Sequence, residues 1–79
     1  MDKHRVRFEG PTALALRVAS TLADAEGVEL ISSDQPVSVA DGTVALNVVV
    51  EGERDAVVLA VAGIRREMPP RASIEITGG

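Results

Sequence analysis

The stretch VELISSDQPVSVADGTVALNVVVE, residues 28–51, contains two strand-like segments joined by Asp41-Gly42. An Asp-Gly pair favours a tight two-residue hairpin turn, because both residues tolerate the backbone angles that such a turn needs. In residues 43–51 the side chains alternate between two faces with the period of a strand. The face formed by positions 44, 46, 48 and 50 carries only Val and Leu. The stretch therefore predicts an antiparallel hairpin in the middle of the chain.

The register of this hairpin predicts a break in its first strand. With Asp-Gly as the turn, Val39 pairs with Val44 and Val37 pairs with Leu46, so that all four face the core. If the same register continued toward the start of this strand, Val28 and Leu30 would lie on the sheet face away from the core. One residue must then be absorbed at 34–36, where the proline cannot donate a ladder hydrogen bond.

Helices are expected on either side of the hairpin. Apolar residues recur at helical spacing after Gly10-Pro11-Thr12 and again across residues 54–67. Alternating segments at residues 5–9 and 72–77 predict the outer strands. Strand, helix, strand, strand, helix, strand is the order of the ferredoxin-like fold, an α+β arrangement in which two β-α-β units form a four-stranded antiparallel sheet with both helices on one face. We predict that fold.

The composition indicates a single small domain. The chain has 79 residues, and residues 1–4 and 78–79 are expected to be frayed. Hydrophobic residues make up 46% of the chain, but only Phe8 is aromatic, so aliphatic side chains must fill the core. No run approaches the ~20 apolar residues of a membrane span, no secretory signal is recognisable and cysteine is absent, which together predict a cytoplasmic protein. A net charge of −4 and the scarcity of aromatic residues argue against nucleic-acid binding.

A candidate anion site arises where the first helix begins. Gly10 and Thr12 place backbone N–H groups at the same end of the predicted domain as Arg65, Arg66 and Arg71. N–H groups at a helix start and guanidinium groups are the donors that bind phosphate or carboxylate groups. The alternative is that arginines in a last helical turn only complement the helix dipole.

No catalytic site is expected. His4 is the only histidine and lies in a segment predicted to be frayed, so the sequence offers no partner for a metal site or a Ser-His-Asp group. The carboxylates are scattered over loops and helix ends, and none is recognisable as a buried acid–base pair. On the sheet face opposite the helices, Arg7 is expected to pair with Glu75. The sequence thus predicts a protein without catalytic residues, bound metal or cofactor.

Two surfaces are candidates for binding a second copy of the chain or another protein. One is the solvent side of both helices, where surplus apolar residues could form a continuous patch. The predicted interface residues are Leu16, Ala23, Val58, Leu59 and Ala62. The other candidate is the edge strand, residues 28–33, whose backbone could pair with that of a symmetry mate. Both surfaces lead to the prediction of a homo-oligomer.

The Gly10-Pro11 step into the first helix and the entry Gly27-Val28-Glu29-Leu30 into the second strand resemble ACT-like regulatory domains. This resemblance covers nearly the whole chain and implies a domain that binds small molecules at subunit interfaces. The segment from Asp41-Gly42-Thr43-Val44 to Glu51-Gly52-Glu53, followed by Pro69-Pro70-Arg71-Ala72, looks like the second half of acylphosphatases.

The acylphosphatase resemblance implies a phosphate-binding loop before the first helix, an Arg on that helix and an Asn on the second strand. Arg17 could match the Arg, but residues 9–14 lack the repeated glycines and residues 28–33 contain no Asn. This resemblance therefore implies a shared fold and not a shared reaction. The expected function is a non-catalytic interaction or regulatory module that self-associates. The alternatives are an ACT-like domain that binds a small molecule or anion and, third, a degenerate acylphosphatase-like enzyme.

Overall fold

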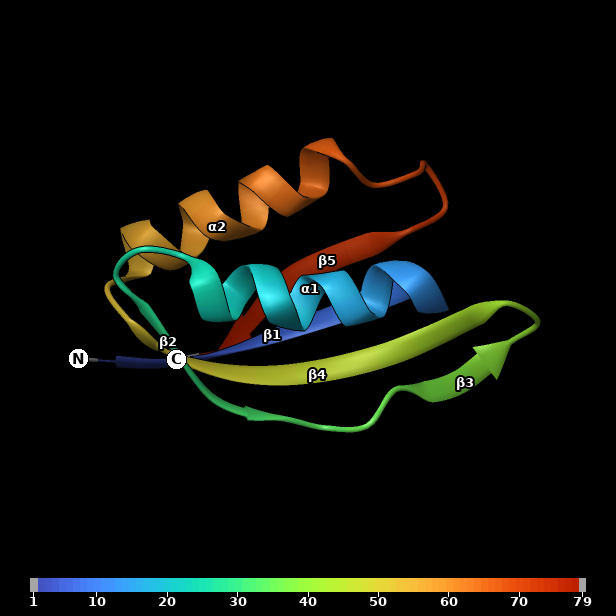
Figure 1. The fold of residues 1–79 in the computed structure, drawn as a ribbon, viewed down its shortest axis with the longest axis horizontal. Coiled ribbons are helices and arrows are strands. Elements are labelled where there is room, and N and C mark those ends of the chain that lie inside the picture. Colours follow the sequence, from blue (N-terminus) through green and yellow to red (C-terminus); the bar gives the residue numbers. More distant parts are fainter. Residues whose placement is uncertain (1, 79) are drawn as a thin grey trace.

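The computed structural model describes residues 2–78 and has an α+β architecture with two helices and an antiparallel sheet of five strands (Figure 1). The elements are β1 (Asp2–Pro11), α1 (Thr12–Asp24), β2 (Val28–Ser33), β3 (Val37–Ala40), β4 (Thr43–Gly52), α2 (Arg54–Arg66) and β5 (Ser73–Gly78). Residues 2–4, which the sequence predicted to be frayed, form the first part of β1. Among the residues described, no helix is both long enough and apolar enough to cross a membrane.

The sheet has the strand order β2-β4-β1-β5, and β3 also pairs with β4. In Figure 1, β2 and β3 follow one another along the same edge of the long strand β4. The predicted sheet of four strands thus has five, because the second predicted strand is interrupted at residues 34–36. The break that the sequence predicted at this position is confirmed.

The predicted register of the hairpin is wrong. The sequence paired Val39 with Val44 and Val37 with Leu46, whereas the structure pairs Val37 with Ala45. The shift arises because β3 carries a bulge close to the turn, which inserts one residue into the ladder. Since a change of one residue moves a side chain to the other face, Val37 leaves the core and is 61% exposed.

A second irregularity lies between Leu30 and Ser32 in β2. The residues before it, Val28 and Leu30, keep their side chains on the core face of the sheet. Leu30 pairs with Val50 and packs against the buried cluster, while Ser32 pairs with Val49 on the opposite face. The sequence predicted one absorbed residue, but the register shifts by one residue at each of three places: at this bulge, at the break and at the bulge in β3. Each shift exposes part of the edge, and residues 31–40 are all exposed.

The hydrophobic core lies between one face of the sheet and the two helices. Phe8 is completely buried at its centre, and aliphatic side chains fill the rest, as the composition predicted. The other large contributors with almost no exposure are Leu22, Leu46, Val6, Val18, Val48, Val50 and Val57. These residues recur every second position on the strands and every three or four positions on the helices, so the two periodicities in the sequence define the same core.

Two glycines are required by the backbone for different reasons. Gly42 has a φ of +74° in the hairpin turn, with open space where a side chain would lie. Gly52, at the end of β4, lies against the turn that precedes β2. A Cβ atom at Gly52 would come within 2.4 Å of the carbonyl oxygen of Gly27. The two connections at this end of the domain therefore pack directly through their backbones.

Candidate functional site

The most exposed part of the fold is the sheet edge formed by β2 and β3. β3 pairs with β4 on one side only, so along its outer side the backbone N–H and C=O groups have no strand partner within the described chain. This edge carries three large apolar side chains that are open to solvent. Ile31 is 43% exposed, Val37 is 61% exposed and Val39 is 52% exposed.

The middle of this edge carries no charged side chains. Residues 35–40 contain no charged side chain, and Asp34 and Asp41 flank them on either side. Natural sheet edges are usually protected by charges, prolines or bulges. Here Pro36 and the bulge in β3 give part of that protection, but no charge stands among the exposed valines.

The helix face predicted as an interface does not form one patch. Ala25, which directly follows the last residue of α1, and Ala60 on α2 line a shared hollow, so these residues mark the flanks by which the helices face each other. Leu16 precedes Ala25 by nine residues, which is two and a half helical turns, and so lies on the far flank of α1. Val58, two residues from Ala60, likewise lies on the far flank of α2. Leu59 is the exception, because it lines the hollow between the helices.

The five predicted interface residues therefore divide into three places. Leu16 and Ala23 lie on the side of α1 away from α2, Val58 and Ala62 lie on the side of α2 away from α1, and Leu59 is between them. Leu16 and Leu59 are the most exposed large apolar residues among those described, at 66% and 73%. Single exposed residues of this kind are common on protein surfaces and define no contiguous site.

The predicted anion site is brought together only in part. Gly10 and Arg71 line an open hollow of about 400 Å³ together with Pro11, Thr43, Pro69 and Pro70. Thr12 begins α1 and is exposed next to this hollow in sequence. Pro11 precedes the helix without a side-chain capping hydrogen bond.

The two helix arginines of that prediction have other surroundings. Arg65 donates a hydrogen bond from Nη2 to the carbonyl oxygen of Ile74 on β5, with 2.8 Å between the atoms. This contact connects the end of α2 to the neighbouring strand, so Arg65 has a structural role. Arg66 is exposed in the last turn of α2, where its charge complements the helix dipole.

His4 is the one buried polar or charged residue among those described. Only 3% of it is exposed, in contrast to the frayed position that the sequence predicted. Its Nε2 atom lies 3.2 Å from the carbonyl oxygen of Gly52, and its Nδ1 atom has no hydrogen-bond partner in the described part of the chain. The ring thus helps to hold the start of β1 against the end of β4. Within residues 2–78, no group of three His, Cys, Asp or Glu side chains is placed to hold a metal ion.

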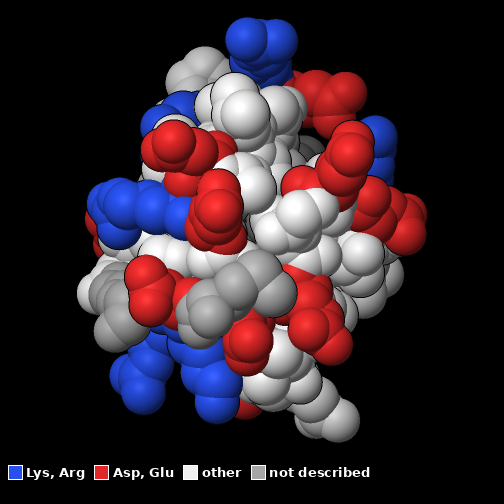
Figure 2. All heavy atoms as spheres, turned by 90° about the vertical axis from the view of Figure 1, so that its left-hand side faces the viewer, with Lys and Arg blue, Asp and Glu red and all other residues white. Residues whose placement is uncertain are grey.

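The end of the domain at which α2 begins is rich in acidic side chains. Figure 2 shows acidic groups spread over this end, with basic groups mostly toward its margins. Glu29 on β2 and Glu51 on β4 are direct cross-strand neighbours, and Lys3 on β1 is the other neighbour of Glu51. Like charges placed opposite each other on a sheet are destabilising, and one lysine beside the pair offsets this only in part.

On the sheet face opposite the helices, Arg7 forms an ion pair with Glu9, with 2.8 Å between Nη2 and Oε1. Glu75 is the cross-strand neighbour of Arg7 on β5, but the predicted ion pair between them is not the one that forms. Residues two apart on one strand share a face and are roughly 7 Å apart, so the long side chain of Arg7 can reach Glu9 as well as the neighbour on the next strand.

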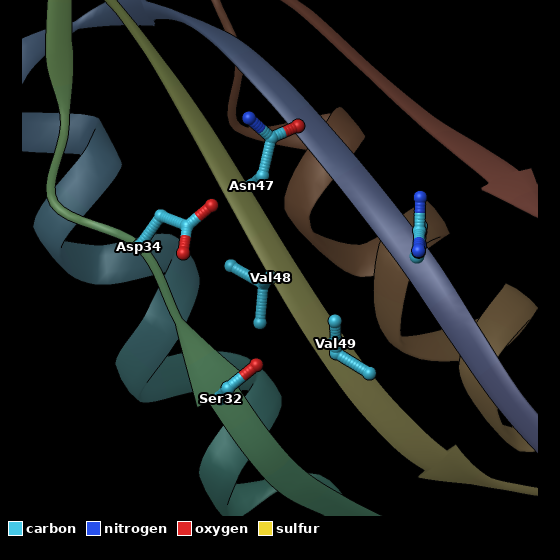
Figure 3. A pocket seen from close by; sticks show the side chains of 6 residues that line it. Ser32, Asp34, Asn47, Val48 and Val49 are labelled. Atoms are coloured by element: carbon cyan, nitrogen blue, oxygen red, sulfur yellow. The ribbon is translucent and has the colours of Figure 1, made fainter.

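The same open face carries a polar hollow of about 430 Å³. It is lined by Arg5, Ser32, Asp34, Asn47, Val48 and Val49. Figure 3 shows Asp34 reaching from the end of β2 toward Asn47 on β4, with Ser32 and Val49 further along the two strands. The backbone N–H of Asp34 donates to the carbonyl oxygen of Asn47 at 3.0 Å, which positions Asp34 beside β4 although the strand has ended. The alternation of residues along the sequence does not predict this hollow, because Ser32 reaches this face through the bulge and Asp34 reaches it at the break.

No protein-family profile matches the chain, and a search of curated proteins finds no significant match. The site must therefore be interpreted from its own geometry.

Proposed function

We propose that the protein is a non-catalytic interaction module of ferredoxin-like fold that associates with a second copy of itself through the β3 edge. The strand order β2-β4-β1-β5, with the two helices on one side, supports the ferredoxin-like assignment if β2 and β3 are counted as one interrupted strand. The observation that carries the function is the exposure of Val37 and Val39 on an unpaired edge with no charged residue between positions 35 and 40.

Antiparallel pairing of β3 with β3 of a second copy gives hydrogen-bond partners to the exposed backbone N–H and C=O groups on its outer side. Two copies related by a twofold axis present the same segment to each other, so each backbone donor on one strand can meet an acceptor on the other. When the axis passes through the middle of β3, Asp34 of one copy lies at the same end as Asp41 of the other, two positions from the residue directly opposite it. The two carboxylates are then diagonal neighbours about 7–8 Å apart and not a directly opposed pair, so their repulsion is reduced but adds to the weakness of the association.

The strength of this association follows from its small size. Partial burial of two valines in each copy contributes roughly 3–6 kcal/mol, and the backbone hydrogen bonds of a four-residue strand add about 1 kcal/mol each. Association itself costs about 4–15 kcal/mol. These terms are of similar size, so the expected complex is weak and its formation depends on protein concentration.

The test is the solution mass measured by sedimentation equilibrium from micromolar to millimolar protein. We expect the wild type to shift toward dimer as concentration rises, and Val39→Lys to remain monomeric because it places a charge on each facing strand. Leu59→Lys is the matched control, since it puts the same charge on an equally accessible helix position. A wild type that stays monomeric at millimolar concentration would overturn the proposal. Dissociation by Leu59→Lys but not by Val39→Lys would assign the interface to the helices instead.

A small-anion site is the second candidate, and the hollow shared by Gly10 and Arg71 is the observation that favours it. Inorganic phosphate bound there should shift the amide resonances of Gly10 and Thr12, and Arg71→Ala should abolish the shift. Arg66→Ala is the control, because Arg66 does not line the hollow. Amides that do not move at millimolar phosphate would exclude this candidate.

A further inference from the structure

Two rows of side chains cross the open sheet face next to each other. In the first row, Arg5 on β1 and Ser32 on β2 are the neighbours of Val49 on β4. Directly paired residues of antiparallel strands point to the same face, so these three side chains stand side by side. The polar hollow lies along this row and is open to solvent above Val49, which is half-buried.

The second row completes the hollow. Asn47 on β4 has Arg7 as its neighbour on β1, and the backbone of Asp34 is hydrogen-bonded to it from the other side. Arg7 does not line the hollow, because its guanidinium is paired with Glu9. Asp34 and Asn47 therefore form one wall with Ser32 (Figure 3). Arg5 lies on β1, on the opposite side of β4 from β2.

The charges that line the hollow are not neutralised by the protein. Within residues 2–78, the side chains of Arg5 and Asp34 make neither a salt bridge nor a hydrogen bond. Neighbouring Arg7, by contrast, is fully engaged by Glu9. Arg5 lies one strand spacing from β4 beside Val49, and Asp34 lies on the other side of β4 beside Asn47, two residues further along. Two strand spacings combined with two residues of strand length put the two backbones roughly 12 Å apart. A positive group and a negative group thus face one hollow from opposite sides without contacting each other.

We propose that this hollow binds a small linear molecule with an amino group at one end and a carboxylate at the other. The ammonium group donates hydrogen bonds to the carboxylate of Asp34 and to the oxygens of Asn47 and Ser32. The carboxylate of the ligand accepts a bidentate pair from the guanidinium of Arg5. The methylene chain between the two ends lies over Val49. Because the walls are far apart, a molecule with separated charges fits, whereas one with both charges on the same carbon does not reach both sides.

The proposal can be tested by NMR titration, because Asn47 is the only asparagine and Gln35 the only glutamine in the chain. Their side-chain amides give two separate pairs of resonances, one inside the hollow and one outside its lining. ε-Aminocaproate is the probe, with caproate and hexylamine as analogues that lack one charge each and alanine as the analogue with adjacent charges. We expect ε-aminocaproate to shift the Asn47 pair in a saturable way, with a much smaller effect on Gln35.

Substitutions of Arg5 and Asp34 test whether the shift of the Asn47 resonances depends on the charges of these two residues. Arg5→Gln and Asp34→Asn should each weaken binding about tenfold or more, as expected for the loss of a charge-assisted hydrogen bond. Arg66→Gln and Asp24→Asn make the same chemical changes at exposed positions outside the hollow and should leave binding unchanged. All four positions are exposed, and a circular dichroism spectrum checks that each variant is folded.

Three results would overturn the proposal. The first is an Asn47 amide that does not move in a saturable way through the millimolar range of ε-aminocaproate. The second is binding of caproate, hexylamine or alanine as tight as that of ε-aminocaproate. The third is an affinity that is unchanged in Arg5→Gln and Asp34→Asn. The hollow opens on the sheet face and not at its edge, so the titration of the Val39→Lys variant tests it independently of self-association.

Discussion

Replacement of Gly52 by Ala tests the close packing of the two connections at one end of the domain. The added Cβ would lie 2.4 Å from the carbonyl oxygen of Gly27, far inside the contact distance of a carbon and an oxygen atom. Its other near neighbours, 3.4 Å and 3.5 Å away, are also backbone atoms, so no flexible side chain can move aside. Gly52 has, in addition, a φ of +158°, which side-chain-bearing residues rarely adopt. The backbone of one connection must therefore move.

The expected loss of stability follows from these two effects. Overpacking of a rigid site costs about 1–3 kcal/mol, and an unfavourable backbone conformation adds roughly 1–3 kcal/mol. We therefore expect Gly52→Ala to lower the free energy of unfolding by about 2–6 kcal/mol, out of the roughly 4–12 kcal/mol that a domain of this length has in total. The shift should also weaken the contact between Nε2 of His4 and the carbonyl oxygen of Gly52.

Gly63→Ala is the matched control, because it adds the same methyl group in the interior of α2, where no atom beyond its chain neighbours and the adjacent helix backbone lies within 4 Å of it. Alanine there should raise the free energy of unfolding by about 0.5–1 kcal/mol, since it restricts the unfolded chain and favours the helix.

Urea and thermal unfolding followed by circular dichroism measure both changes. At about 4–8 °C for each kcal/mol, the melting temperature should fall by roughly 8–48 °C for Gly52→Ala and rise by a few degrees for Gly63→Ala. A loss below about 0.5 kcal/mol for Gly52→Ala, with Gly63→Ala behaving as expected, would refute the close approach of Gly52 and Gly27.

Three further substitutions test single features of the structure. Leu59→Glu should change the free energy of unfolding by less than about 0.5 kcal/mol at low protein concentration, because the side chain is 73% exposed; a larger loss would indicate a buried contact on the helix face. Glu29→Lys should raise it by about 0.2–1 kcal/mol, since it turns the repulsion with Glu51 into attraction, and the gain should shrink in high salt. Arg65→Ala should lower it by about 1–2 kcal/mol through loss of the hydrogen bond to β5, whereas Arg66→Ala should be close to neutral; equal effects of the two would contradict the structural role of Arg65.

Much of the candidate site was not accessible to sequence reasoning. The exposed apolar edge could be located approximately, because the second strand was expected at an edge, but the exposure of Val37 and Val39 depends on a single inserted residue. The polar hollow was missed because Ser32 reaches the open face only after the bulge in β2, and Asp34 reaches it only where the strand breaks. The role of Arg65 depends on a carbonyl group of another strand, which no local pattern records.

The sequence by itself determined the α+β class, the two helices with their core-facing stripes, the turn at Gly42 and the break at 34–36, but not that this break divides the second strand into β2 and β3. These features depend on local backbone preferences and on periodicity, which are properties of neighbouring residues. Only the tertiary structure decided which strand residues pair, that His4 is buried and that Arg7 pairs with Glu9. Those outcomes depend on contacts between distant segments, where a shift of one residue moves a side chain from the core to solvent and one bulge absorbs that shift.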